Sequence, residues 1–256
     1  MKRFSRNLII LCINVLIFIL AGCAGLHQAN WTIKAENQTK TVGRIGYIEL
    51  KLTNQNGLSV SNAQINLMYK ENDQWKTFKD ALTGEETFVT DGNGVARVSV
   101  FPSKEAVWQF LGYLTDDPSI ETTFVVNFKK PQWLFMIWMC ADNDLEGNAL
   151  KDIEEMKNGN NNISTFLIFD GRAGEDKFLV MDELGGWKTI EVFQQDLDSG
   201  DSSSLLEYLK NTFGWYEANN YSLILWDHGN AWIYDSAYKK EITSRAIAFD
   251  DTSKHA

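Results

Sequence analysis

Cysteine is scarce in this sequence, and its positions exclude a disulfide framework. The 256 residues contain three cysteines. Cys12 and Cys23 lie near the N-terminus, and Cys140 is the one cysteine in the rest of the chain. A small exported protein that relies on disulfides needs paired cysteines within its folded part. We therefore expect no internal disulfide, so the packing of apolar side chains has to hold the fold together.

The sequence also lacks an excess of positive charge, which argues against nucleic acid as a partner. Twenty-four Lys and Arg residues stand against 34 Asp and Glu residues, for a formal net charge of −10. There is no basic stripe, and a polyanion would be repelled. The apolar and charged fractions, 44% and 23%, are ordinary for a globular protein, so long disorder is not predicted.

The apolar run near the N-terminus is too short to span a bilayer comfortably, and it is typical of an export signal instead. Three basic residues within the first six precede the 13 residues 8–20, which are nearly all apolar. A transmembrane helix needs about 20 such residues. The run Leu20-Ala21-Gly22-Cys23 then resembles a bacterial lipobox, in which the cysteine is acylated and becomes the new N-terminus.

We therefore expect a lipoprotein signal peptide over residues 1–22, lipid on Cys23 and a short linker over 23–29. The protein would be anchored to a membrane through its N-terminal lipid, on the extracytoplasmic side of the cell envelope. The alternative is a plain signal peptide or a short membrane anchor. Loss of the three basic residues would leave 21 basic against 34 acidic groups, a net charge near −13.

Residues 30–128 have the pattern of an all-β domain. Short runs with period-two alternation are separated by turn signals such as Asn56-Gly57 and Asp91-Gly92-Asn93-Gly94. The runs are WTIKAEN, GYIELKLTN, AQINLMYK, QWKTFKD, GVARVSVF, AVWQFLGYL and ETTFVVNF. Seven such strands predict an immunoglobulin-like sandwich, and TDGNGVARVSV resembles a hairpin of bacterial Ig-like repeats. The domain could be a stalk, or it could bind substrates or surfaces.

Residues 131–256 alternate between strands and helices, after a boundary at Lys129-Lys130-Pro131. This pattern predicts an α/β domain with a mostly parallel sheet. The predicted strands are Trp133–Cys140, Ser164–Gly171 and Tyr221–Trp226, with a hairpin that turns at Gly185-Gly186. One predicted helix is capped by Asp144, and the other begins at a capping box formed by Ser204 and Glu207. Because three strands are too few for a complete domain, the last strand should expose an unpaired edge.

The chemistry of the chain is expected at Tyr221–Trp232. The apolar run 221–226 predicts a strand buried on both faces, and it ends abruptly in Asp227-His228-Gly229. Open α/β sheets bind ligands at the carboxyl ends of their strands. A histidine held there is a candidate general base, and the alternative is a histidine that merely ends a strand.

Three segments resemble the clostripain-like cysteine peptidases, in the same order as in that family. They are WLFMIWMCADNDLE, YSLILWDHGNAW and RAIAFDDTS, and together they span residues 133–253. The resemblance implies a caspase-like α/β fold and cleavage of proteins or peptides after Arg or Lys. It implies that His228 is the catalytic histidine and that the Gly229 N–H stabilises the oxyanion. Ala231 stands where the family usually has a second glycine.

The family's nucleophile is missing, since no cysteine follows His228. The resemblance places that cysteine in an Asp-x-Cys context on the next strand, and thiolate chemistry needs it. We therefore expect residues 131–256 to be the N-terminal part of an incomplete peptidase domain, and the chain to be inactive. Cys140 is the alternative nucleophile, although a free cysteine is commonly a small buried hydrophobe. The alternative function is a non-catalytic surface binding or adhesion lipoprotein that uses the Ig-like domain.

A calcium site is a further hypothesis, because a calcium requirement is known among relatives. Asp196, Asp198 and Asp201, with Glu207 eleven residues after the first, resemble an EF-hand loop, but Gly200 and Asp201 stand in the reverse of the required order. The acids would also favour the N-terminus of the following helix. We therefore predict no metal ligands.

Overall fold

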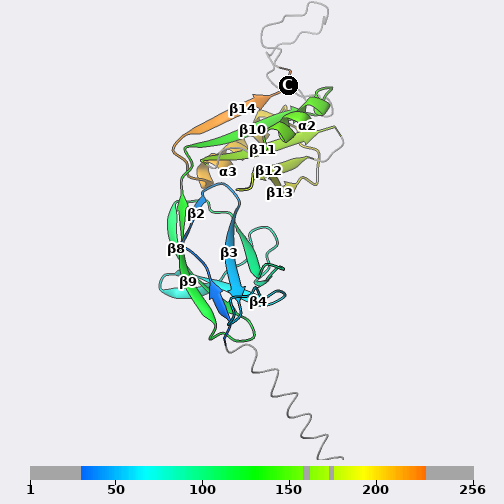
Figure 1. Cartoon of the computed structure of the whole chain (residues 1–256). Coiled ribbons are helices and arrows are strands. Elements are labelled where there is room, and N and C mark those ends of the chain that lie inside the picture. Colours follow the sequence, from blue (N-terminus) through cyan, green and yellow to red (C-terminus); the bar gives the residue numbers. More distant parts are fainter. Residues whose placement is uncertain (1–29, 158–161, 173–175, 229–256) are drawn as a thin grey trace, which may run out of the picture.

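The computed structural model of the chain describes residues 30–157, 162–172 and 176–228. Two β structures follow each other along these residues, and Figure 1 shows the first below the second. Among the described residues, no helix combines the length and the apolar character that a membrane crossing requires.

The first structure is a β-sandwich built from short alternating strands. Its strands are β1 (Thr32–Lys34), β2 (Gln38–Thr41), β3 (Gly46–Thr53), β4 (Gln64–Glu71), β5 (Gln74–Thr77), β6 (Thr87–Val89), β7 (Val95–Val100), β8 (Ala106–Leu114) and β9 (Glu121–Lys129). The sheet β1-β3-β7 faces the sheet β2-β9-β8-β4-β5, in which β6 also pairs with β4. Side chains from both sheets, such as Leu50 of β3 and Phe110 of β8, form one buried apolar core. The alternating pattern places every second side chain in that core.

All seven predicted runs form strands, and the structure adds β2 and β6. Both additions are short and lack a clear apolar alternation, QTKT in β2 and TFV in β6. Strand β2 pairs with β9 in parallel, from Gln38 beside Val126 to Thr41 beside Lys129. Such a strand is stabilised by its neighbour rather than by its own sequence, which explains why the pattern does not reveal it.

The second structure is one five-stranded sheet with a helix on each face. Its strands are β10 (Trp133–Ala141), β11 (Ile163–Gly171), β12 (Lys177–Met181), β13 (Trp187–Val192) and β14 (Tyr221–Trp226), in the order β13-β12-β11-β10-β14. Strands β11, β10 and β14 are parallel, whereas in the predicted hairpin β12 is antiparallel to β11 and β13 is antiparallel to β12. Two pairings of each kind make the described sheet mixed rather than mostly parallel. The turn is at the predicted place, and Gly185 has a positive φ of 83° there.

Helices α2 (Glu146–Glu155) and α3 (Ser202–Trp215) cover opposite faces of the sheet. Ile137 and Met139 pack against α2, while the alternate residues Met136 and Trp138 pack against α3. Figure 1 shows the two helices on either side of the sheet. Because successive side chains of a strand point to opposite faces, one apolar strand serves two layers.

The predicted capping box before α3 is wrong. The helix begins at Ser202, and its N-cap is Asp201, whose carboxylate accepts hydrogen bonds from the N–H groups of Ser203 and Ser204. Leu205 packs against the core of the sheet, whereas Leu206 is exposed. An aspartate is as good an N-cap as a serine, so the local pattern alone does not choose between Asp201 and Ser204.

Strand β14 differs from the prediction that it is buried on both faces. Tyr221, Leu223 and Ile224 are each about 40% exposed. Within the described residues β14 pairs only with β10, so it lies at the edge of the sheet. Among the described residues this edge of β14 is unpaired, as expected, which explains the exposure that an apolar run alone would not suggest.

The sandwich docks on the amino ends of the parallel strands through the loop between β2 and β3. Gly43 has a φ of 70°, and a β-carbon at that position would meet the Ser164 side chain at 3.3 Å. The next residue, Arg44, is 1% exposed and donates from Nε to the Asp182 carbonyl (2.8 Å) and from Nη1 to the Ile163 carbonyl (3.1 Å). Only glycine tolerates both this backbone and this close approach.

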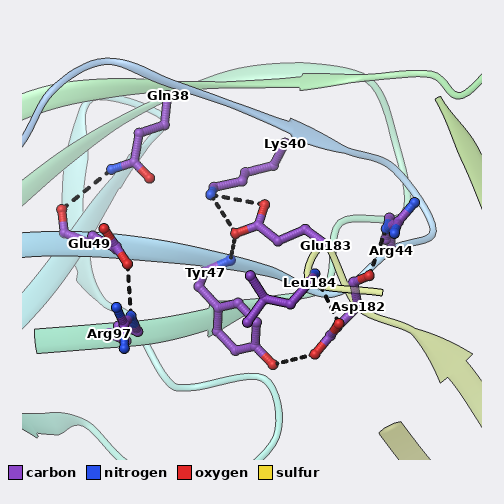
Figure 2. A network of polar contacts seen from close by, with 9 residues as sticks. All are labelled: Gln38, Lys40, Arg44, Tyr47, Glu49, Arg97, Asp182, Glu183 and Leu184. Carbon is purple, nitrogen blue, oxygen red and sulfur yellow. Dashed lines mark hydrogen bonds and ion pairs between the residues drawn. The ribbon is translucent and has the colours of Figure 1, made fainter. Parts of the chain in front are cut away.

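Charged side chains surround that contact (Figure 2). Lys40 pairs with both carboxylate oxygens of Glu183 at 2.8 and 3.0 Å, and the Tyr47 hydroxyl donates to Asp182 at 2.9 Å. Ile45 lies beside Asp182 in a parallel bridge and belongs to a core cluster with residues of the sheet, including Phe166. The sandwich and the sheet thus share both a polar network and an apolar core.

The two ends of the sandwich are far apart along β3. Thr32, where β1 begins, lies opposite Thr53, whereas Gly46 at the other end of β3 adjoins the docking loop. Eight extended residues span about 25 Å at roughly 3.3 Å each. The described chain therefore enters at the end of the sandwich that faces away from the sheet (Figure 1).

Candidate active site

The candidate site lies where β10 and β14 end, at the carboxyl edge of the sheet. The two strands run side by side in parallel, with Met139 beside Trp226. The residues that follow, Cys140 to Asp144 on one strand and Asp227-His228 on the other, therefore reach the same edge. This register brings the segments WLFMIWMCADNDLE and YSLILWDHGNAW together.

Asn143 ties the two loops together. Its side-chain amide donates to the Cys140 carbonyl and to the Asp227 carboxylate, both at 3.0 Å. Its side-chain oxygen accepts from the N–H of Leu145 at 2.8 Å. Asn143 is buried, so these bonds replace the water that its amide loses on folding. The loop before α2 is thereby fixed against the loop after β14.

His228 is held by two aspartates. The Asp227 carboxylate accepts a hydrogen bond from the backbone N–H of His228 at 2.6 Å. The ring Nε2 lies 2.5 Å from Oδ1 of Asp144. The His228 and Asp144 side chains are 41% and 78% exposed, so the pair is open to solvent. The hydrogen bond from His228 lowers the pKa of the Asp144 carboxyl below its usual value.

Asp144 therefore does not cap the helix, and that prediction is wrong. The N-cap of α2 is Leu145, without a side-chain hydrogen bond to the helix. The carboxylate bonds to a residue 84 positions further along the chain instead. Local sequence favours an aspartate just before a helix as its cap, but here the carboxylate bonds to a residue at the adjacent strand end.

Helix α2 is itself fixed to the sheet by two tryptophans. The indole N–H of Trp226 donates to the Asp152 carboxylate, and that of Trp187 donates to the Ile153 carbonyl, both at 2.8 Å. Trp226 is two residues before His228, so the helix that follows Asp144 is anchored to the strand that carries the histidine. These contacts give the Asp144–His228 pair a rigid frame.

Cys140 is fully buried on the α3 side of the sheet. Its side chain packs with Met136 and Trp138, and its sulfur lies 3.8 Å from the Ser199 carbonyl. His228 is bonded to the loop that enters α2, on the other face. This placement suits a small hydrophobe. The two other predicted site residues, Cys23 and Gly229, lie outside the described residues.

Three carboxylates at the same edge of the sheet lie close enough together to hold a metal ion. They belong to Asp170, Asp176 and Asp196, and their oxygens lie within 4.8 Å of one another. The two oxygens of Asp176 accept from the backbone N–H groups of Gly171 (3.0 Å) and Leu197 (2.7 Å), so this carboxylate organises two loops. The EF-hand hypothesis requires Asp201 as a ligand, but Asp201 caps α3.

An apolar hollow of about 220 Å³ lies on the α2 face, but its chemistry is unlike that of a catalytic site. It is lined by Phe135, Ile137, Met156, Ile163, Thr165, Met181 and Ile224. Ile224 precedes His228 by four residues, so the hollow lies toward the middle of the sheet. No lining residue is titratable, and the polar groups that could do chemistry lie at the edge above it.

Sequence reasoning identified His228 but missed Asn143, Asp144 and Asp152 as its supports. The signal was available, because Asn143 and Asp144 are part of the segment WLFMIWMCADNDLE. Two segments that belong to one motif set and end neighbouring strands should contact each other. Which atoms make the contact required the structure.

Comparisons with known proteins show a likeness in this part of the chain. Residues 137–256 match the family model of the clostripain family. Among solved structures, a B. fragilis cysteine protease is 24% identical over 43% of this chain and 98% of its own, with a TM-score of 0.36.

Two further solved structures show weaker likeness. The D0-D1 domain of intimin is 21% identical over 38% of this chain and 45% of its own, with a TM-score of 0.27. The Lin-41 filamin domain is 18% identical over 38% and 91%, with a TM-score of 0.26. No curated protein matches. Residues 137–256, which are similar to the clostripain family, include both loops of the candidate site.

Proposed function

We propose that this chain carries the histidine half of a clostripain-like cysteine endopeptidase site on an exported lipoprotein. The observation that carries the proposal is the placement of His228. It ends a parallel strand at the carboxyl edge of the sheet, with its ring 2.5 Å from a carboxylate, inside the region that matches the family. The caspase-like fold and the preference for Arg or Lys come from the resemblance of the three segments.

The chemistry assigned to His228 is that of a general base. In a cysteine peptidase the imidazole accepts the thiol proton, the thiolate attacks the scissile carbonyl, and the imidazolium then protonates the leaving amine. The N–H of Gly229 would stabilise the oxyanion. The 256 residues contain no cysteine after His228, so we propose that they hold the base and not the nucleophile, and that they do not cleave peptides by themselves.

We propose that the sandwich, residues 30–128, is an Ig-like spacer between the membrane and the peptidase unit. In this proposal lipid on Cys23 anchors the chain on the extracytoplasmic side of the envelope. The direction of the chain supports this arrangement, because β1 begins at the end of the sandwich remote from the sheet. The candidate site lies at the opposite edge of that sheet, so the spacer would hold it away from the membrane surface.

The decisive experiment assays the protein that the source cell makes from the intact coding region. We expect it to cleave arginyl or lysyl peptide reporters, to lose that activity on thiol alkylation, and to lose it in the His228→Ala variant. A product that cleaves no reporter in a panel covering all residues before the scissile bond would overturn the proposal. Cleavage that survives alkylation would overturn the cysteine chemistry alone.

The 256-residue chain provides the second arm. We expect no hydrolysis of the same reporters. Hydrolysis that disappears in both His228→Ala and Cys140→Ala would make Cys140 the nucleophile and contradict its assignment as a buried hydrophobe. Fractionation of the envelope tests the anchor, since Cys23→Ser should release the chain from membranes.

A further inference from the structure

We propose that Asp144 is a positioning residue that fixes the ring tautomer of His228. This inference rests on the proposed function, in which His228 is the base. It assigns the proton of the neutral ring to Nε2 and leaves Nδ1 free to accept a proton from a thiol.

The hydrogen bond decides which ring nitrogen carries the proton. Nε2 of His228 and Oδ1 of Asp144 are 2.5 Å apart. An ionised carboxylate can only accept, so the ring has to donate from Nε2. The same bond lowers the pKa of Asp144, which keeps its carboxylate ionised at neutral pH. A neutral imidazole with its proton on Nε2 has its lone pair on Nδ1.

The backbone and the ring of His228 are held by separate residues. Asp227 accepts from the backbone N–H of His228, and Asn143 in turn binds Asp227. These contacts place the residue but leave its ring free to rotate. Among the described residues, Asp144 is the one whose bond to the ring is seen. Removal of its carboxylate should therefore change the tautomer without displacing the strand end.

The contact of Asp144 with His228 is not explained by a contribution to the stability of the fold. Its side chain is mostly exposed and does not cap α2. Exposed ion pairs contribute little to folding because water competes for both partners. An orienting role fits the geometry better, because the residue enters from a loop that Asn143 and the anchored helix α2 hold in place.

The test is nitrogen NMR on the full chain in detergent micelles, with 15N-labelled histidine, at a pH where the rings are neutral. His228→Gln assigns the His228 signals among the three histidines of the chain. In the native chain we expect the pyrrole-type signal on Nε2 and the pyridine-type signal on Nδ1. In Asp144→Asn the tautomer ratio should move toward Nδ1–H by roughly twofold to fivefold, the range expected for an exposed charge pair.

Two controls separate this role from loss of charge or of fold. Glu155→Gln removes one negative charge from an exposed position on α2 and should leave the ratio unchanged. Asp144→Glu keeps the carboxylate and should therefore give a tautomer ratio close to that of the native chain. A native chain with mainly Nδ1–H, or an unchanged ratio in Asp144→Asn, would overturn the proposal. Because the readout needs no hydrolysis, it fails or succeeds independently of the peptidase assay, which tests the proposed function.

Discussion

The two edges of the second sheet use similar residues in opposite environments. At the carboxyl edge, the Asp144–His228 pair is exposed and links two loops of the same unit. At the amino edge, Arg44 and Asp182 are buried and link the sheet to the sandwich. Both edges combine a cationic or basic group with an acid.

The difference in burial suits the two edges to different tasks, domain contact at the amino edge and proton transfer at the carboxyl edge. A buried guanidinium has lost its water, so every lost partner leaves a desolvated group and destabilises the fold. An exposed pair can break at little cost, because water replaces the partner. The amino edge is therefore suited to holding two domains together, and the carboxyl edge is suited to a proton-transfer group that must change partners.

The largest effect is expected from Arg44→Ala at the amino edge. The substitution removes donors to two carbonyls and a buried positive charge beside Asp182. We expect the free energy of unfolding to fall by about 3 kcal/mol. Urea unfolding of the full chain measures it. The matched control Arg97→Ala removes an exposed pair with Glu49 and should cost less than about 1 kcal/mol. Equal losses in the two variants would mean that burial does not set the difference between the edges.

The next effect is expected from Asn143→Ala at the carboxyl edge. Asn143 is the buried member of that edge and makes three hydrogen bonds, so its loss should cost about 2 kcal/mol. Asn148→Ala, on the exposed side of α2, should be neutral or slightly stabilising, since alanine favours helix. Thermal unfolding compares the two. If Asn143→Ala behaved like Asn148→Ala, the link between the two loops would be unimportant.

A smaller difference is expected between two glycine substitutions. Gly43 and Gly57 both have positive φ, 70° and 75°, but only Gly43 has close neighbours. Alanine at Gly57 should cost about 1 kcal/mol from backbone strain alone. Alanine at Gly43 should cost about 2 kcal/mol, because the methyl group also crowds the docking contact with Ser164. Unfolding midpoints of the two variants give the difference, and a zero difference would place the docking loop further from the sheet than the structure has it.

Much of this architecture follows from local patterns. Period-two alternation identified seven strands of the sandwich, and the apolar runs identified the three parallel strands. The patterns fail where a neighbour, and not the sequence, supplies the stability. Strand β2 is polar and forms because β9 lies beside it, and β14 is apolar yet lies at an edge.

The contacts of the site and of the docking region could not be predicted for the same reason. Asp144 stands where an N-cap is expected, and its actual partner is 84 residues away. Arg44 and Asp182 are 138 residues apart and have no shared motif. Strand order brings such residues together, and strand order is a property of the whole sheet.

Acid should weaken the amino edge, by a smaller amount than these substitutions. Burial raises the pKa of Asp182, but hydrogen bonds from Gly186, Tyr47 and Lys188 outweigh it, so the pKa is lowered. A lowered pKa stabilises the fold above the unfolded value of about 3.9, and that stability is lost as the pH falls through the folded value.

Thermal midpoints measured from pH 6 down to pH 2 test this sign. The native chain should lose stability below about pH 4, and Asp182→Asn should lose less over the same range because it has no proton to gain. Asp116→Asn, at an exposed position of the sandwich, should keep the native slope. A slope in Asp182→Asn equal to that of the native chain would assign the acid sensitivity to other carboxyls.

The smallest effect on stability is expected at the most functional position. Asp144→Ala removes one partner of the exposed pair, and water should solvate His228 in its place, so the urea midpoint should not change measurably. The helix should not weaken either, since Asp144 is not its cap. A clear loss of stability in Asp144→Ala, similar to that in Asn143→Ala, would make the pair part of the structural frame. No loss of stability, together with an altered tautomer of His228, would show that the two edges have different roles. Asp182 would then hold the two domains together, and Asp144 would orient the base.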